Sequence, residues 1–150
     1  MKRYLKIFAG FSLIFLLSLA LTGLASAETI RGKGWLHAEG SGTATLHMTG
    51  RIEIKGHGVG LVYIYGAEEI QAEGDGRRTN LDDGGVVFRG YSGTINVVGD
   101  GMTIKMVGGK IDFTAHGQGV AHLRGRGHYE TANLSGDWNN RGVELEVVEE

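Results

Sequence analysis

The segment GWLHAEGSGTATLHMTGRIEIKGH, from Gly34 to His57, sets the pattern that the rest of the chain follows. A glycine returns in it every eight residues, at Gly34, Gly42 and Gly50. Between these glycines the even-numbered positions are apolar or glycine, and the odd-numbered positions are mostly polar. Alternation with a period of two is typical of β-strands with one buried face. Because eight is an even number, the same face of the chain stays buried from one octad to the next.

The octad extends through most of the chain. The glycines recur at Gly58, Gly66 and Gly74 and, after one longer step, at Gly85, Gly93, Gly101, Gly109, Gly117 and Gly125. The segment Gly50–Gly66 also aligns with Gly109–Gly125, which indicates an internal duplication. We therefore expect residues 28–150 to form one domain, built from two related halves at about 32–74 and 85–136. A C-terminal strand follows, in which Val143, Leu145 and Val147 alternate with polar residues, and we expect it to lie at an edge of the sheet.

The pattern predicts an all-β fold, because no apolar stripe with the 3.6-residue period of a helix competes with the alternation. Two architectures keep the parity of the faces across each glycine. One is a glycine-rich octad-repeat β-solenoid or β-roll, in which successive octads stack. The alternative is an antiparallel meander, as a β-sandwich or small barrel, whose loops end in glycine bulges. Asn and Asp do not collect in the columns that such loops would occupy, which favours the solenoid.

The rhythm lapses twice. The polar stretch Gly74–Gly84 lengthens the glycine step and reads as a loop that joins the two halves. Its adjacent Asp82 and Asp83 lack the residue spacing of a calcium loop, so a solvated turn is expected there. The second lapse places Met102, Ile104 and Met106 on the opposite parity, which predicts a β-bulge.

Residues 1–27 have the anatomy of a cleaved signal peptide. Lys2, Arg3 and Lys6 precede an apolar run that ends in Ala25-Ser26-Ala27. The run is short and contains Gly and Ser, so we expect cleavage after Ala27 and no transmembrane segment in the mature chain. The sequence therefore predicts an exported protein of the periplasm or the extracellular space.

Charge and cysteine content narrow the partners. The chain has 17 acidic against 15 basic residues, and three of the basic residues lie in the signal peptide. This acidic balance argues against nucleic acid as a partner. No cysteine is present, so disulfides do not stabilise the exported chain.

One octad is apolar on both faces. Val59, Leu61, Tyr63 and Tyr65 occupy its outward positions, which are polar elsewhere. Either another layer of the same chain covers this strand, or the strand is a surface for self-association or for another partner, such as an envelope component or a polysaccharide.

The histidines are the clearest candidates for chemistry. Six are present, all in the polar columns, where carboxylates accompany them: His37, His47, His57, His116, His122 and His128, with Glu39, Glu53, Asp112 and Glu130. Outward histidines and carboxylates on neighbouring strands can bind zinc or copper. However, no pair has a ligand spacing such as HxH or HExxH. Solvated surface histidines are therefore the preferred interpretation, and we assign no residue to a metal.

No catalytic or cofactor site is evident. GxSxG, a phosphate-binding loop and a cysteine nucleophile are all absent from the sequence. The strings GHGVG and GHGQG lack the strand–loop–helix context of a dinucleotide site, and the octad already explains their glycines. We therefore predict no enzyme activity and no cofactor.

The strings GSGTATLHMTG and GAEEIQAEGDG resemble the glycine-rich β-helical repeats in the head regions of bacterial autotransporter adhesins. That resemblance covers about Gly32–Gly127 and implies a role at the cell envelope without catalytic residues. Together, these features predict a secreted or periplasmic structural or interaction protein of the envelope that presents a repetitive β surface. The alternatives are a zinc- or copper-binding envelope protein and a carbohydrate-active enzyme.

Overall fold

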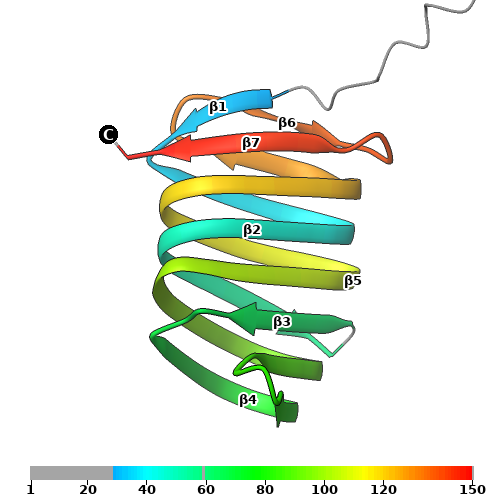
Figure 1. Ribbon diagram of the computed structural model, residues 1–150. Helices are drawn as coiled ribbons and strands as arrows, with labels where there is room; N and C mark the ends of the chain where they lie inside the picture. Colours follow the sequence, from blue (N-terminus) through cyan, green and yellow to red (C-terminus); the bar gives the residue numbers. More distant parts are fainter. Residues whose placement is uncertain (1–28, 59, 150) are drawn as a thin grey trace, which may run out of the picture.

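The computed structural model describes residues 29–58 and 60–149, and this part of the chain is all-β, as predicted, with no helix. Residues 1–27, where the signal peptide is predicted, lie outside the described residues. Two strands are much longer than ordinary strands and wind around a common axis (Figure 1). The strands are β1 (Thr29–Lys33), β2 (Trp35–His57), β3 (Leu61–Tyr65), β4 (Glu69–Asn80), β5 (Val86–Thr131), β6 (Ser135–Trp138) and β7 (Val143–Val148).

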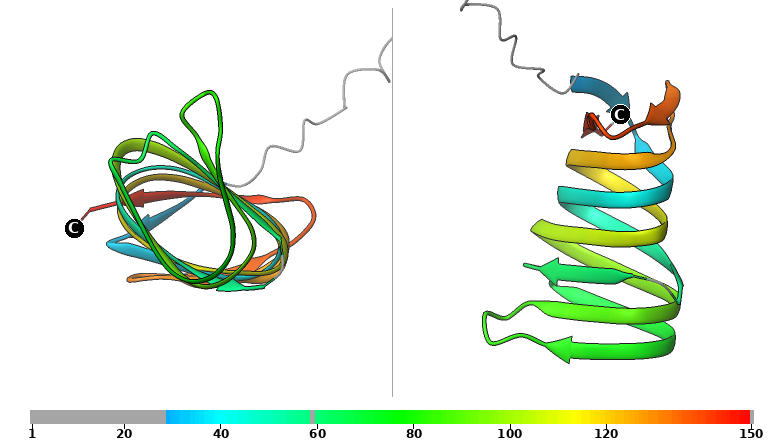
Figure 2. Two further views of the ribbon diagram at one scale, coloured as in Figure 1. Left: turned by 90° about the horizontal axis from the view of Figure 1, so that it is seen from below. Right: turned by 90° about the vertical axis from the view of Figure 1, so that its right-hand side faces the viewer.

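The winding arises because β5 passes β2 on both sides. Ala38 pairs with Phe113 on one side and with Tyr129 on the other, and the ladder between the two strands is antiparallel throughout. The two β5 partners of a β2 residue are therefore about two octads apart. Seen along the axis, the ribbons trace one superimposed oval (Figure 2). Two octads thus make one turn, and each octad covers one side of the oval.

The predicted solenoid is not confirmed. Octads do stack along the axis, but those next to each other in β2 and β5 run in opposite directions. The seven strands form one open sheet, so the chain is not a closed barrel either. The related halves also form no separate lobes, because β5 winds between segments of the first half.

The recurring glycines mark the two bends of the oval. At the bends glycine faces glycine across the ladder: Gly42 pairs with Gly125, and Gly50 with Gly117. Gly42 has φ of 128°, which side chains rarely adopt. A Cβ added there would overlap the carbonyl oxygen of Arg124 and lie 2.8 Å from the Cα of Gly125. The octad is therefore a bend period, set by how closely two backbones approach where both turn.

The even columns of the first octads fill the inside of the oval. Leu36, Leu46 and Ile52 are fully buried there. The second half contributes Phe113 and other apolar residues of β5 to the same core. Because strands carry alternate residues on opposite faces, one core runs along the whole axis and the polar columns form the outer surface.

The predicted bulge is present, and there are two of them. Met48 pairs with Met102 and Gly50 with Gly99, so three β5 residues oppose two on β2. A second shift follows the pairing of Gly42 with Gly108. The two bulges bracket Met102, Ile104 and Met106, which are all buried. Each extra residue reverses the parity once, so these side chains point inward.

The prediction of a loop over Gly74–Gly84 is wrong for most of its length. β4 continues to Asn80 and pairs with β5, and only residues 81–85 turn, with Gly84 N–H donating to the carbonyl of Leu81 at 3.1 Å. Asp82 and Asp83 are exposed in this turn, as expected, and Asp83 also accepts a hydrogen bond from Gly85 N–H. β4 looks like a loop in sequence because nearly all its residues are exposed, as an outermost strand permits.

The C-terminal strand is also not the edge strand that was expected. β7 lies between β5 and β1, and β1 pairs with it in parallel, from Thr29 opposite Glu144 to Lys33 opposite Val148. Its predicted inward residues Val143, Leu145 and Val147 are buried. The acidic residues between them contact neighbouring strands. Glu146, for example, forms an ion pair of 2.9 Å with Arg31 of β1.

Candidate functional sites on the outer face

All six histidines lie on the outer surface, as their columns predicted. Five are exposed, and His37 is half-buried. The Nδ1–H of His37 donates to the carbonyl oxygen of Phe113 at 3.0 Å, so this side chain stabilises the pairing of β2 with β5. Four of the others form two groups, one on each side of the oval, and His116, which pairs with Trp35 and Arg51, belongs to neither.

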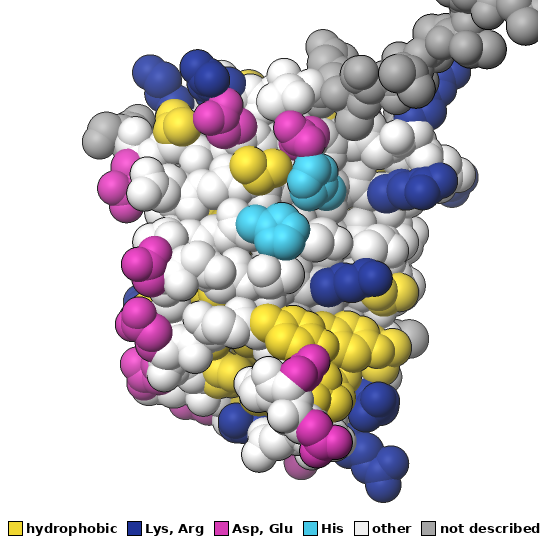
Figure 3. Space-filling model, viewed as in Figure 1, with side chains coloured by type: hydrophobic (Ala, Val, Ile, Leu, Met, Phe, Trp, Pro, Cys, Tyr) yellow, Lys and Arg dark blue, Asp and Glu magenta, His cyan; other side chains and the backbone are white. Residues whose placement is uncertain are grey.

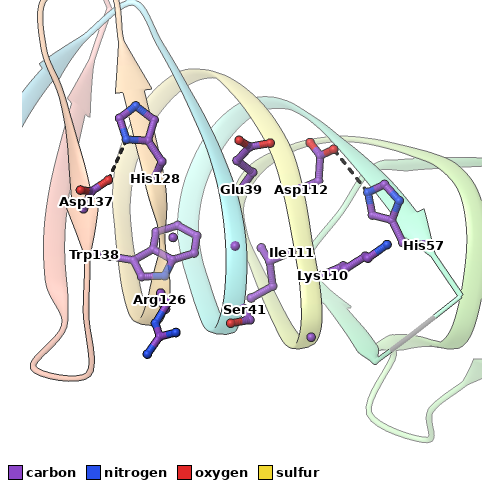
Figure 4. A pocket seen from close by; sticks show the side chains of 13 residues that line it. Glu39, Ser41, His57, Lys110, Ile111, Asp112, Arg126, His128, Asp137 and Trp138 are labelled. Carbon is purple, nitrogen blue, oxygen red and sulfur yellow. Dashed lines mark hydrogen bonds and ion pairs between the residues drawn. The ribbon is translucent and has the colours of Figure 1, made fainter.

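The first group lines an open groove of about 770 Å³ at one bend (Figure 4). Its polar side chains come from five segments of the sheet: two of β2, two of β5 and one of β6. The groove is lined by Glu39, Gly40, Ser41, His57, Gly109, Lys110, Ile111, Asp112, Arg126, Gly127, His128, Asp137 and Trp138.

Histidines and carboxylates form a row across this groove. Glu39 pairs with Asp112 on one side and with His128 on the other, and His128 pairs with Asp137. His128 Nδ1–H donates to Asp137 Oδ1 at 2.9 Å, and His57 Nε2 lies 3.4 Å from Asp112 Oδ2 (Figure 4). Each end of the row is therefore a histidine–carboxylate pair, with Glu39 between them.

Asp112 is the least satisfied member of the row. Its Oδ1 atom is buried and accepts no hydrogen bond from the described residues. Glu39 stands directly opposite it, and like charges in that position repel each other. A cation or a hydroxyl-rich ligand would relieve both.

The second group lies on the other side of the oval. The rings of His47 and His122 are 6.4 Å apart between centroids, and His122 Nδ1 is 3.3 Å from Glu144 Oε2. Two imidazoles and a carboxylate are ligands suited to zinc or copper. However, among residues 29–58 and 60–149 no group of three or more His, Cys, Asp or Glu is already placed to hold a metal ion.

Outward apolar side chains gather over β3 (Figure 3). Leu61, Tyr63 and Tyr65 are half-buried, and Val107 pairs with Leu61 from the neighbouring strand. We call these four residues the β3 patch. Val87, the partner of Tyr63 on the other side, is fully buried although it faces outward. Val59, which was expected on this face, lies outside the described residues. Among residues 29–58 and 60–149, no second layer of strands covers the patch.

Tyr91 occupies the inside of the bend nearest β4. Its side chain is buried, its hydroxyl has no hydrogen-bond partner among the described residues, and its ring packs edge-on against Phe88 at 5.2 Å. Burial raises the pKa of Tyr91 above the ordinary value of 10.0, and the charges of Asp75 and Glu73 raise it further. A neutral hydroxyl is therefore favoured at this position.

The comparisons with known proteins give no match: no protein-family model, no curated protein and no solved structure is similar to the chain. In the described part of the chain, no helix has the length and apolar character needed to cross a membrane. Sequence reasoning missed Asp137 and Val107 as surface partners. Both depend on the register between distant strands, and nothing in their local sequence indicates it.

Proposed function

We propose that this is an exported structural or interaction protein of the bacterial envelope that holds a polysaccharide against the β3 patch. The observation that carries the proposal is the outward position of Leu61, Tyr63 and Tyr65 on a surface whose other columns are polar. The signal-peptide pattern of residues 1–27 supports export. Binding of a polysaccharide to this outer face requires no catalytic group.

A polysaccharide suits the size and chemistry of the patch better than a protein does. Stable protein interfaces bury about 800 Å² on each partner, from some 20–30 residues, and the β3 patch has four. Tyrosine offers an apolar ring and a hydroxyl together, so it can contact a sugar ring and still bond to its hydroxyl groups. Thr103 and Lys105, which pair with Tyr65 and Tyr63, add polar groups along the same strand.

Co-sedimentation with purified peptidoglycan tests this proposal. The parent protein should pellet with the polymer, and the double variant Tyr63→Thr/Tyr65→Thr should bind at least about tenfold more weakly, which corresponds to 1.4 kcal/mol. Threonine keeps the strand propensity of these positions, and equal thermal unfolding temperatures would show that the fold is intact.

Asp112→Asn in the groove is the matched control and should bind like the parent. Failure of the parent to pellet overturns the proposal. Binding that is lost with Asp112→Asn and kept without the tyrosines places the polymer in the groove instead. If the tyrosine variant changes only the oligomeric state, the β3 patch is a self-association surface.

A second candidate function, zinc or copper binding, is favoured by the proximity of His47, His122 and Glu144. These side chains are on the surface and can rotate to close on an ion. Calorimetric titration with Zn²⁺ and Cu²⁺ should give one site that His122→Ala removes. His37→Ala, which changes a histidine bonded to the backbone, should leave it unchanged. No heat with the parent protein ends this candidate.

A further inference from the structure

The outermost strand at one end of the winding has an unpaired edge. Among residues 29–58 and 60–149, β4 pairs with β5 alone (Figure 1). It is twelve residues long and almost entirely exposed. Along such an edge every second residue directs its N–H and C=O groups away from the sheet, where another strand can bind them.

The core is also open at this end. Ile70 pairs with Val97, and Ala72 with Ile95, so both side chains belong to the inward columns. Val97 and Ile95 are fully buried, whereas Ile70 is only half-buried and Ala72 is exposed. The inward face of β4 therefore lacks the neighbouring strand that covers the equivalent residues elsewhere.

The charges of β4 change sign at its bend. Glu69, Glu73 and Asp75 precede or occupy the bend on the outward face, and Arg77 follows it on the same face. Edge strands that avoid pairing typically carry charges, especially lysines, that would repel a second copy. The acidic-then-basic order of β4 has the opposite effect, because an antiparallel copy of the strand would set acid against base.

The bend itself supplies the register. Within the molecule, Gly40-Ser41-Gly42 lies antiparallel to Gly125-Arg126-Gly127, so that each glycine faces a glycine. Gly74-Asp75-Gly76 is a bend of the same form, with φ of 141° and 146° at its glycines. On its free side it has no Gly-x-Gly partner in the described chain. A second β4 provides one in the required direction.

We propose that two copies of this chain pair antiparallel through β4, about a twofold axis at Asp75. Gly74 then faces Gly76 of the second copy, and Glu73 faces Arg77 of the second copy, twice by symmetry. Arg77 also lies diagonal to Asp75 of the second copy, which offsets the repulsion between the two Asp75 side chains. The same register covers Ala72 and Ile70 with a further strand.

This dimer is one continuous winding with a closed end at each extremity. Rotation about an axis through the bend exchanges the two sides of the oval, so the two β3 patches point to opposite sides of the combined particle. Two copies of the protein would then present two binding faces instead of one. The pairing does not depend on what the β3 patch binds.

Sedimentation velocity over a range of protein concentrations tests the pairing. The parent should be a dimer that dissociates on dilution and more readily at high salt, since exposed ion pairs are screened. Glu73→Arg and Arg77→Glu should each weaken the dimer by about tenfold or more, because each places like charges opposite each other twice. The double variant Glu73→Arg/Arg77→Glu exchanges the charges and should restore it.

Lys33→Glu, a charge reversal at an exposed position of β1 at the other end of the winding, is the matched control and should dimerise like the parent. Failure of the double variant to restore the dimer, or a parent that is monomeric at all concentrations, overturns the proposal. So does a dimer that is lost in Tyr63→Thr/Tyr65→Thr and unchanged by Arg77→Glu. If Arg77→Glu is monomeric and still binds peptidoglycan, dimerisation and polysaccharide binding are independent. Failure of the pairing proposal is then distinguishable from failure of the proposed function.

Discussion

The two ends of the winding finish the same core in different ways. At one end β6 brings Trp138 onto the bend formed by Gly40 and Gly127, where its ring is 2% exposed. At the other end β4 leaves Ile70 and Ala72 in contact with solvent. Both ends have strand edges, but the core is covered by a large side chain at the first end and meets solvent at the second.

A wound sheet of this kind does not limit its own length. Each turn leaves an edge and an open core, so a sheet of this kind stops only where something else covers it. At the closed end, β1, β6 and β7 and the indole of Trp138 do so. At the open end, Arg78 lies 5.6 Å from the ring centroid of Phe88 and gives only partial cover. The strand pairing proposed above would complete that end.

The first prediction compares bend glycines near the two ends, whose substitution should cause the greatest loss of unfolding free energy. Gly42 has β5 on both sides, whereas Gly74 has it on one. An added Cβ would overlap the carbonyl oxygen of Arg124 at Gly42 and that of Ser92 at Gly74. We expect Gly42→Ala to cost about 4 kcal/mol or more of unfolding free energy, because the backbone has no room to move. Gly74→Ala should cost about 1–2 kcal/mol, since an edge strand can shift outward.

Urea denaturation measures both. Gly109→Ala is the control, because a Cβ there meets no atom within 4 Å, and its stability should stay within about 1 kcal/mol of the parent. Equal losses at Gly42 and Gly74 would show that β4 is held as firmly as the inner turns. The two ends would then hold their strands equally firmly.

The second prediction removes the seal at the closed end. Trp138→Ala should lower the unfolding free energy by about 3–4 kcal/mol, because a fully buried aromatic leaves a cavity that the bend cannot fill. Trp35, which is only half-buried, supplies the matched control, and Trp35→Ala should cost less than half as much. Chemical denaturation followed by circular dichroism avoids relying on the tryptophan signal. Similar losses for both variants would contradict the sealing role.

The sequence was sufficient to predict most of the strands, the buried columns and one of the two bulges. It was not sufficient for their direction, because an octad keeps its parity whether its neighbour runs parallel or antiparallel. The part of β4 from Gly74 to Asn80 was read as a loop, since an exposed edge strand needs no apolar alternation. β7 was read as an edge because the sequence does not reveal that β1, about 115 residues earlier, pairs with it.

The candidate sites show the same limit. The outward position of the histidines and of the β3 tyrosines follows from column parity alone. Which of them meet does not: Glu39 comes next to Asp112 and His128 through two passes of β5, one turn apart. A one-residue bulge shows in the local alternation, but the sequence does not reveal which residues of the partner strand become the new neighbours.

The third prediction concerns Tyr91, beside the open end. Since its pKa is raised in the folded state, the native protein holds the phenolic proton more tightly than the unfolded chain. This contribution is complete below the unfolded pKa of about 10 and is lost as the pH rises through the folded pKa. We expect the parent to lose more stability than Tyr91→Phe between pH ~9 and ~11.

Near pH 7 the same variant should match or exceed the parent by up to about 1 kcal/mol, because it removes a buried hydroxyl without a partner among the described residues. Urea midpoints at both pH values give the comparison. A variant that is less stable at neutral pH would show that the hydroxyl is bonded in solution. Identical alkaline slopes for the two proteins would show that Tyr91 is not protected from ionisation.

The fourth prediction concerns charge at the closed end. There we expect it to contribute little to stability, whereas at the open end we propose that it directs association. Arg31 and Glu146 form an ion pair of 2.9 Å between β1 and β7, but the arginine side chain is 73% exposed. Backbone pairing with β7 already holds β1, and Gly32 packs against Thr131. Arg31→Gln should therefore change the unfolding free energy by no more than about 0.5 kcal/mol and leave the oligomeric state unaltered. A loss above about 1.5 kcal/mol would mean that ionic contacts hold the closed end together. A small loss, beside a dissociated Arg77→Glu, would show that charge directs association at the open end and contributes little to the closed one.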